Sequence, residues 1–446
     1  MRYDLAVVGS GQGGVPLALA FAKRGQRVVL FERGDLGGCC VNVGCTPSKA
    51  FLASAHAAGR ARRAVDVHVR CDVRPDVPAV MERVRGVIGE WRGGVEKKFA
   101  DSTVELVRAE ASFDAPHVLR ANGATYEADV VVLDTGSRAV VPPIAGLAGT
   151  PFLTNENFFA QRDLPRRLVV VGSGYIGLEL GQGAARLGSA VTVVTPDDRL
   201  IAREETDVCG VLTASFARDG ITTLLETRVT AVAYANGEFA VTAGERTLRA
   251  DGLLVAVGRA PNVPDGARDA RIALDERGYV RCDAHLRTSL EGHYALGDIA
   301  GQPQFTHVAW EDYRRLDAII GGDASRTRDD RVLGYAMYTE PQIGRVGLSA
   351  DQASARGIPH RVVTLPLTDV ARGPEWALEA GFFRLVVDPE TDAILGATFV
   401  GYEAGELIHV ILAHMEAGST WRVLERSVHI HPTFGEGLPS LARLLM

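Results

Sequence analysis

The chain has 446 residues, 46% of them hydrophobic and 23% charged, and is long enough for two to four domains with well-filled cores. A net charge of −7 argues against a nucleic-acid partner and against electrostatic binding to an anionic membrane surface. No apolar run is long enough to span a bilayer, and the first residues lead into a strand-like segment rather than a signal peptide. The six cysteines form no disulfide framework and fit a reducing compartment, so we expect a cytoplasmic protein.

The N-terminal segment predicts a dinucleotide-binding strand–helix–strand unit. Its strands are expected at residues 5–8 and 28–31, with a helix at 15–24 between them. The turn before the helix contains Gly9, Gly11 and Gly14, and Glu32 ends the second strand. These glycines allow a tight turn, close approach of the backbone to a pyrophosphate and close packing of helix on strand. The helix N-terminus favours the phosphates, and Glu32 would accept the ribose hydroxyls.

The next motif is GGCCVNVGCTPSK at residues 37–49. Cys40 and Cys45 are separated by four residues, and positions five apart in an ideal helix have Cα atoms roughly 8–9 Å apart. A disulfide needs less than about 7 Å. If the two pair, the backbone must be distorted, and Gly44 can supply unusual angles. A disulfide in forced geometry is easily reduced, which favours a redox role over a structural pair, a zinc half-site or two unrelated thiols.

The dinucleotide unit recurs at residues 168–194, which predicts a second bound dinucleotide. The glycines of its turn are Gly172, Gly174 and Gly177. Thr195 lies as far after Gly172 as Glu32 lies after Gly9, so the acid that favours NAD over NADP is missing from this repeat. Arg199 and Arg203 are the nearby candidates for a 2′-phosphate. We therefore expect NADPH, rather than NADH, as the preferred nucleotide.

Further apolar segments surround the second repeat. A strand at 130–133 is followed by Gly136 and ends against a nucleotide, and residues 138–150, rich in proline and glycine, form a crossover. Residues 253–262, with Gly258, close the second domain. A short strand then ends at Asp298, which is a flavin ligand or, alternatively, a helix N-cap or a turn residue.

The last part of the chain, from about residue 331, lacks nucleotide-binding glycines. Strands are expected at 382–387 and 394–400, and a helix at 406–417. His431 and Glu436 stand close together near the end, in the sequence HPTFGE. An imidazole with an acid nearby suits proton transfer in both directions near neutral pH.

These motifs together resemble the class I flavoprotein disulfide reductases, the family of dihydrolipoamide dehydrogenase, glutathione reductase and mercuric reductase. The cysteine motif resembles the redox-active motif of that family, the segment ending at Asp298 resembles its second flavin motif, and HPTxxE resembles its acid–base signature. The resemblance covers nearly the whole chain. One departure is Cys39, where the family usually has threonine, and which is either a neutral substitute or an additional thiol.

The resemblance implies an α/β fold with two Rossmann-like dinucleotide-binding domains and a C-terminal α+β dimerisation domain. The expected parts are an FAD-binding domain at 1–146, an NAD(P)-binding domain at 147–262, a central FAD-binding segment at 263–330 and the dimerisation domain at 331–446. The protein would be a homodimer that binds FAD and NADPH or NADH.

The resemblance also assigns roles to single residues. Cys45 would be the charge-transfer thiolate beside the flavin, and Cys40 would exchange with substrate. Lys49 would lie near the flavin N5 atom and pair with Glu179, and Tyr175 would cover the flavin until the nicotinamide enters.

Two more roles follow for the C-terminal histidine motif. His431 would act as the acid–base group for the interchange thiol, oriented by Glu436. In the family this histidine belongs to the partner subunit, which would make a homodimer necessary for a complete site.

The substrate is the open question. Mercuric reductases share the cysteine motif and a stretch like residues 302–305, but they end in a vicinal cysteine pair and lack the histidine dyad. The reactive-chlorine resistance flavoproteins, which are associated with copper(II) reduction, are more similar, through residues 304–306 and 312–314. We expect a thiophilic metal ion or a disulfide as substrate, with Cys40 and Cys45 as transient metal ligands only.

The alternatives are a dihydrolipoamide dehydrogenase, a reductase of small disulfides, or a flavin-bound thiol protein that binds metal or senses redox state without turnover. Dihydrolipoamide dehydrogenases keep the dyad, but their nicotinamide site normally has the acid that Thr195 replaces. The nicotinamide-binding repeat argues against a protein that only sequesters metal.

Overall fold

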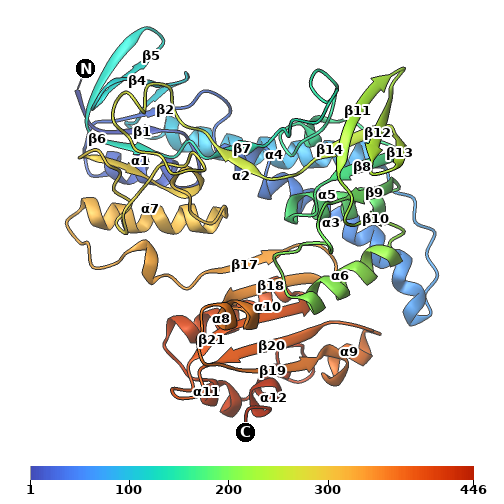
Figure 1. Cartoon of the computed structure of the whole chain (residues 1–446). Helices are drawn as coiled ribbons and strands as arrows, with labels where there is room; N and C mark the ends of the chain where they lie inside the picture. The colour runs from blue at the N-terminus through green and yellow to red at the C-terminus, as the bar shows by residue number, and fades with distance from the viewer. Residues whose placement is uncertain (1) are drawn as a thin grey trace.

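Two sheets of the nucleotide-binding type lie side by side, and a third sheet lies below them at the C-terminal end (Figure 1). The computed structural model describes residues 2–446. This arrangement confirms the expected fold, in which two Rossmann-like units precede an α+β domain. Among the described residues, no helix combines the length and hydropathy that crossing a bilayer requires.

The first sheet is built around β1, whose apolar residues are buried on both faces. The strand order is β3-β2-β1-β6-β5-β4, and β16 pairs with β6. The strands are β1 (Arg2–Val8), β2 (Val28–Phe31), β3 (Glu105–Val107), β4 (Ser112–Ala115), β5 (Val118–Ala121), β6 (Ala124–Leu133) and β16 (His293–Ala295). The helices of this part are α1 (Gly14–Lys23), α4 (Val77–Ala100) and α7 (Thr306–Ile320). Because β16 pairs in parallel with β6, the chain returns to the first sheet after completing the second.

The second sheet repeats the parallel arrangement in the order β10-β9-β8-β14. Its elements are β8 (Arg167–Val171), α5 (Tyr175–Arg186), β9 (Ala190–Val194), α6 (Thr206–Arg218), β10 (Thr222–Leu224) and β14 (Gly252–Val255). A small antiparallel sheet joins it, formed by β11 (Val229–Ala235), β12 (Glu238–Ala243) and β13 (Arg246–Ala250). The predicted crossover begins within β7 (Ser137–Ala139), which pairs with β15 (Arg259–Pro261) where the chain leaves the first unit and returns to it.

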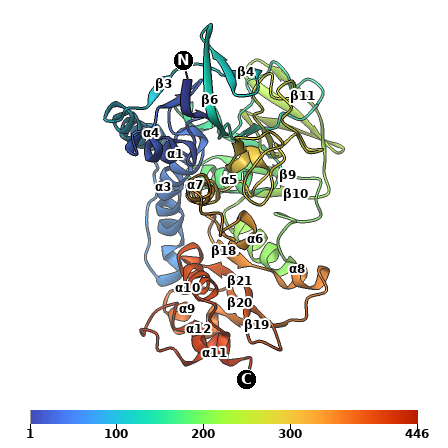
Figure 2. The ribbon, with the colours of Figure 1, turned by 90° about the vertical axis from the view of Figure 1, so that its left-hand side faces the viewer.

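The cysteine motif forms two helices with a break between them. These are α2 (Gly38–Asn42) and α3 (Cys45–Arg63), and α3 runs along the side of the molecule toward the C-terminal domain (Figure 2). The linking residue Gly44 has φ −122° and ψ −119°, outside the helical region. A Cβ atom on Gly44 would lie 2.8 Å from the carbonyl oxygen of Cys39, so only glycine fits. The expected distortion between the two cysteines is therefore present.

The C-terminal sheet has the antiparallel order β17-β18-β21-β20-β19, and α10 packs against β18 and β21. Its strands are β17 (Gly334–Met337), β18 (Gln342–Gly347), β19 (Arg361–Pro366), β20 (Phe382–Val387) and β21 (Ile394–Gly401). Its helices are α8 (Ala350–Ala355), α9 (Arg372–Glu375), α10 (Ala404–Glu416), α11 (Trp421–Arg426) and α12 (Gly437–Arg443). Short 3₁₀ helices occur at Ala64–Val67, Phe158–Ala160, Gly297–Ala300, Arg328–Asp330 and Leu367–Asp369.

Candidate active site

One cavity of about 2100 Å³ brings together both glycine turns, the two cysteines and the end of β16. Most residues predicted for the site line it, namely Gly9, Gly11, Glu32, Cys40, Cys45, Lys49, Gly136, Gly172, Gly174, Tyr175, Glu179, Gly258 and Asp298. Gly14 and Gly177 lie behind the lining, where a Cβ atom would come within 2.6 Å and 2.8 Å of the carbonyl oxygens of Gly9 and Gly172. Those two glycines permit the close helix–strand packing expected of them.

The first glycine turn fits the diphosphate and ribose of FAD. Gly9 has φ +105°, and a Cβ atom there would lie 2.3 Å from the backbone of Asp134. The Glu32 carboxylate is held in place by Ser10, whose hydroxyl and N–H donate to it at 2.7 and 3.0 Å, and by the Gly34 N–H at 2.7 Å. Both Ser10 bonds end on Oε2, so the oxygen that retains capacity for a ribose hydroxyl is Oε1, which accepts only from Gly34.

Asp134 is a part of this turn that sequence analysis missed. It is buried beneath the glycines and accepts a 2.6 Å hydrogen bond from the Gly14 N–H. Burial holds the pKa of the Asp134 carboxyl well above its ordinary value. A neutral Asp134 would not repel a diphosphate bound at the N-terminus of α1.

The thiols of Cys40 and Cys45 have different pKa values. Both are free thiols, and Cys40 donates a hydrogen bond to the sulfur of Cys45. This bond and the positive charge of Lys49 outweigh burial and lower the pKa of Cys45 to about 6, whereas the same bond and burial raise the pKa of Cys40. Thr306, at the start of α7, adds a contact of 3.2 Å between its hydroxyl oxygen and the Cys45 sulfur. At neutral pH the chain therefore holds one thiolate and one thiol.

Lys49 lies one turn after Cys45 on α3 and pairs with Glu179 on α5, as predicted. The Lys49 Nζ is 2.8 Å from the Glu179 carboxylate, and it also lies over the Tyr338 ring, 4.7 Å from the centroid. Burial by itself would lower the pKa of Lys49, but Glu179 and Cys45 outweigh it and raise that pKa. The second carboxylate oxygen of Glu179 accepts the Tyr338 N–H at 2.8 Å. The lysine is thus a fixed positive charge near the thiolate.

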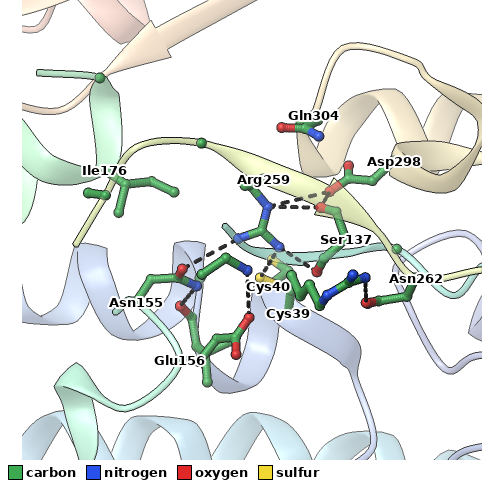
Figure 3. Close-up of a pocket in the computed structure, with 18 of the residues that line it drawn as sticks. Cys39, Cys40, Ser137, Asn155, Glu156, Ile176, Arg259, Asn262, Asp298 and Gln304 are labelled. Atoms are coloured by element: carbon green, nitrogen blue, oxygen red, sulfur yellow. Dashed lines mark hydrogen bonds and ion pairs between the residues drawn. The ribbon is translucent and has the colours of Figure 1, made fainter. Parts of the chain in front are cut away.

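Arg259 is a second residue that sequence analysis missed, although it follows Gly258 in the noted segment. Its guanidinium lies among the side chains of Ser137, Asn155, Cys39 and Asp298 (Figure 3). It donates to the Ser137 carbonyl oxygen at 2.7 Å and to the Cys39 sulfur at 3.4 Å. Cys39 therefore faces Arg259 and the Asp298 side of the cavity. Burial raises the pKa of the Cys39 thiol and keeps it protonated.

The second glycine turn provides a nucleotide site at the N-terminus of α5. A chain of hydroxyl groups leads from Ser173 to Thr195 at 3.0 Å and from Thr195 to the Asp197 carboxylate at 3.1 Å. Asp197 lines the cavity, so a carboxylate stands two residues after the position where Thr195 lacks one. Of the two predicted arginines, Arg203 lines the cavity, whereas Arg199 donates to the Ala202 carbonyl oxygen and is not among the lining residues.

The predicted histidine dyad forms, but outside this cavity. The His431 Nδ1 lies 2.8 Å from the Glu436 carboxylate, and the His431 side chain is 71% exposed. Neither residue lines the cavity that holds the thiols. Within a single chain the dyad therefore faces solvent. Across residues 2–446, no group of three or more histidine, cysteine or acidic side chains is arranged to hold a metal ion.

The unequal thiols predict a titration that can be measured. In the reduced holoprotein, the ultraviolet absorbance of the Cys45 thiolate, taken as wild type minus Cys45→Ser, should fall as the pH drops through about 6. A lowered pKa keeps the thiolate charged above that pH and loses it below. Lys49→Met should move the midpoint upward by roughly half to one pH unit because it removes a nearby positive charge. Lys97→Met, on the exposed face of α4, is the control, and a wild-type midpoint near the ordinary thiol value of about 8.5 would contradict the assignment.

Comparison with known proteins agrees with this geometry. Residues 3–312 match the family described as pyridine nucleotide-disulphide oxidoreductase, and residues 334–442 match its dimerisation domain. The chain is 32% identical to a dihydrolipoyl dehydrogenase of Thermus scotoductus, over 99% of this chain and 97% of that one. It is 34% identical to a mercuric reductase of Acidithiobacillus ferrooxidans, over 98% of this chain and 82% of that one.

Among solved structures, the Cu(II) complex of the HOCl-induced flavoprotein disulfide reductase RclA from Escherichia coli superposes with a TM-score of 0.92. The two sequences are 28% identical, and the match covers 100% of both chains. Family matches to both parts of the chain, and relatives above 30% identity along nearly its whole length, all point the same way. The chain belongs to the pyridine nucleotide-disulphide oxidoreductases, the FAD-dependent family of flavoprotein disulfide reductases.

Proposed function

We propose that this protein is a cytoplasmic oxidoreductase that passes electrons from NADPH or NADH through FAD to Cys40 and Cys45, and from them to a thiophilic metal ion or a disulfide. The observation that supports this most directly is the charged Cys45 sulfur beside Lys49, in the cavity that holds both glycine turns. FAD, when bound, supplies two-electron transfer between the nicotinamide and the sulfur pair. The remaining steps belong to side chains of the protein.

Each side chain has a distinct task in this proposal. Lys49, fixed by Glu179, stabilises the negative charge on Cys45. Cys40, which is protonated at rest, is the sulfur that attacks the acceptor once it has lost its proton, and Cys45 is the thiolate that displaces the product from it. A disulfide acceptor first forms a mixed disulfide with Cys40 and releases one thiol. Attack by Cys45 then closes the Cys40–Cys45 disulfide and releases the second thiol.

The same dithiol can reduce a metal ion with balanced electrons. Closing the Cys40–Cys45 disulfide from one thiol and one thiolate releases two electrons and one proton, and the two electrons suffice for one mercury(II) to become mercury(0) or two copper(II) to become two copper(I). The mercuric reductase relative and the RclA copper(II) complex are the similarities that support this acceptor class. Two thiols that face an open cavity would hold such an ion transiently.

A disulfide such as lipoamide is the second candidate, and one feature favours it. The His431–Glu436 pair is formed at 2.8 Å, and it suits proton transfer to and from sulfur. A dihydrolipoyl dehydrogenase is also among the similar proteins. We propose that His431 reaches the thiols of the partner subunit in a homodimer, which the dimerisation-domain match supports.

The acceptor class can be tested directly. Anaerobic NADPH and NADH oxidation by the holoprotein should be fast with copper(II) or mercury(II), slow with lipoamide and glutathione disulfide, and slowest without an acceptor. Cys45→Ser should lose at least about a hundredfold in rate, because neither the disulfide nor the thiolate can form. Cys71→Ser, a cysteine outside the cavity, is the matched control. Near-normal turnover by Cys45→Ser would refute the cysteine mechanism, and the absence of turnover with every acceptor would favour a binding or sensing protein.

The preferred nucleotide depends on opposing charges around Thr195. We keep NADPH as the proposal because the cavity contains Arg203 and Arg228, while Asp197 opposes a 2′-phosphate. Asp197→Asn should therefore raise kcat/KM for NADPH relative to NADH by about fivefold, the effect of roughly 1 kcal/mol from one charge near the surface. Asp198→Asn removes a neighbouring charge that points to Arg199 and should leave the ratio unchanged. An unchanged ratio in Asp197→Asn would show that its carboxylate does not face the nucleotide.

The shared site predicts complementation between two inactive variants. Cys45→Ser and His431→Ala should each be nearly inactive with a disulfide acceptor. Refolding them together should restore about a quarter of wild-type activity, because half of the randomly formed dimers are mixed and each mixed dimer has one intact site. Recovery is measured against each variant refolded alone. No recovery, with mixed dimers shown to form, would place His431 outside the site.

A further inference from the structure

A buried acid, Glu204, joins three parts of the chain beside the cavity, and nothing in the proposed mechanism uses it. One of its carboxylate oxygens accepts hydrogen bonds from the hydroxyls of Tyr175 at 2.8 Å and Tyr335 at 2.9 Å. Its other oxygen accepts from Arg345 Nη1 at 2.7 Å. Glu204 and Arg345 are each 2% exposed. A buried carboxylate with this many charged and polar partners holds them in fixed positions.

The Tyr175 ring lines the cavity next to the second glycine turn. Tyr175 begins α5 immediately after Gly174. Its ring centroid is 6.4 Å from that of Phe305, the residue before the Thr306 that contacts Cys45. The Arg203 guanidinium lies 5.1 Å from the same ring on the cavity side. A nucleotide that extended from the glycine turn toward Cys45 would therefore meet this ring.

The segment that carries Glu204 is held in a strained conformation. Ile201 has φ +50°, which a β-branched residue rarely adopts, and it is fully buried. Its N–H donates to the Ser173 carbonyl oxygen at 3.1 Å, and its own carbonyl oxygen accepts the Glu204 N–H at 2.8 Å. Such strain persists where the surrounding contacts determine the conformation. The strained turn thus ties the second glycine turn to the acid.

Glu204 is anchored to the C-terminal domain rather than to Tyr175. Tyr335 and Arg345 lie on β17 and β18 of the C-terminal sheet. The next residue, Glu205, accepts from the Thr398 hydroxyl at 3.2 Å and pairs with Arg384 at 3.3 Å, again on that sheet. A movement of the Tyr175 ring would leave Glu204 with Tyr335 and Arg345 as partners. The buried Glu204 carboxylate would keep hydrogen-bond partners, so the free-energy cost of moving the Tyr175 ring is small.

We propose that Glu204 is a positioning residue that holds Tyr175, through its hydroxyl, where the ring closes the nicotinamide end of the cavity. The restraint comes from the C-terminal domain, so that domain sets how readily a nucleotide enters. Burial raises the pKa of Tyr335 to about 12 and also raises that of Tyr175, so both hydroxyls stay protonated donors at neutral pH. This inference rests on the proposed function, because it needs NADPH or NADH to enter at this turn.

The test compares variants of the holoprotein in two measurements. The first is the Kd of the oxidised nucleotides NADP⁺ and NAD⁺, and the second is the quenching of flavin fluorescence by iodide. Tyr175→Phe keeps the ring but frees it from Glu204, so Kd should fall about three- to tenfold as the open state becomes more populated. Iodide quenching should rise in parallel. Glu204→Gln should change both in the same direction by a smaller factor, because an amide oxygen still accepts the hydroxyl.

Tyr335→Phe is the matched control. It removes the other hydroxyl from the same carboxylate oxygen, and with it the contact between the Tyr335 and Tyr175 hydroxyls, but leaves the Tyr175–Glu204 bond, so both measurements should stay within about twofold of wild type. Equal effects of Tyr335→Phe and Tyr175→Phe would overturn the inference, as would unchanged values in Tyr175→Phe. If wild type binds neither nucleotide, the proposed function falls and the inference falls with it. If wild type binds and only the variants fail to differ, the inference alone is wrong.

Discussion

The break at Gly44 is the constraint on which the active site depends. In a continuous helix the side chains of Cys40 and Cys45 would lie farther apart and point in different directions from the helix axis. The break instead makes Cys45 the first residue of α3. That placement does two things. It lets Cys40 donate to the Cys45 sulfur, and it puts Cys45 at a helix N-terminus, where backbone N–H groups favour negative charge. One glycine without room for a Cβ atom thus sets both the distance and the charge of the sulfur pair.

The electrostatics of the cavity follow from fixed charges that come from different domains. Lys49 on α3 reaches Glu179 on α5, and Glu179 in turn accepts the Tyr338 N–H next to the C-terminal sheet. Tyr175 and Glu204 repeat this pattern a short distance away. In both cases a buried acid of the second domain, Glu179 or Glu204, joins a residue of the site to the C-terminal domain. Charges held in this way need no reorganisation when a substrate enters.

Local features were predictable, and distant partners were not. The strands at 28–31 and 382–387 agree with their predicted ends, and α1 and α10 begin within two residues of expectation, because apolar runs and periodicity are local signals. The glycine turns and the cysteine motif were found for the same reason. Thr306 touches Cys45 from 261 residues away, and Arg345 reaches Glu204 across 141 residues. Such contacts depend on how domains pack, and a single sequence carries no local signal for them. Asp134 was missed because its neighbours indicated only a buried strand end.

The difference between the two thiols gives a physical reason for the second subunit. Cys45 is charged near neutral pH, so it is the better leaving group and the ready nucleophile for resolving a mixed disulfide. Cys40, whose pKa is raised, must lose its proton before it can attack an acceptor. Lys49 is protonated and paired with Glu179, and a guanidinium such as that of Arg259 does not act as a base. His307 also lines the cavity, but its Nε2 is held 2.7 Å from the Gly334 carbonyl oxygen. The His431–Glu436 pair is a suitable base, but in its own chain it faces solvent. A site that takes its sulfur pair from one chain and its base from the other would work only as a dimer. Reduction of a soft metal ion would depend on that base less than reduction of a disulfide does, because the metal ion displaces the thiol proton when it binds sulfur.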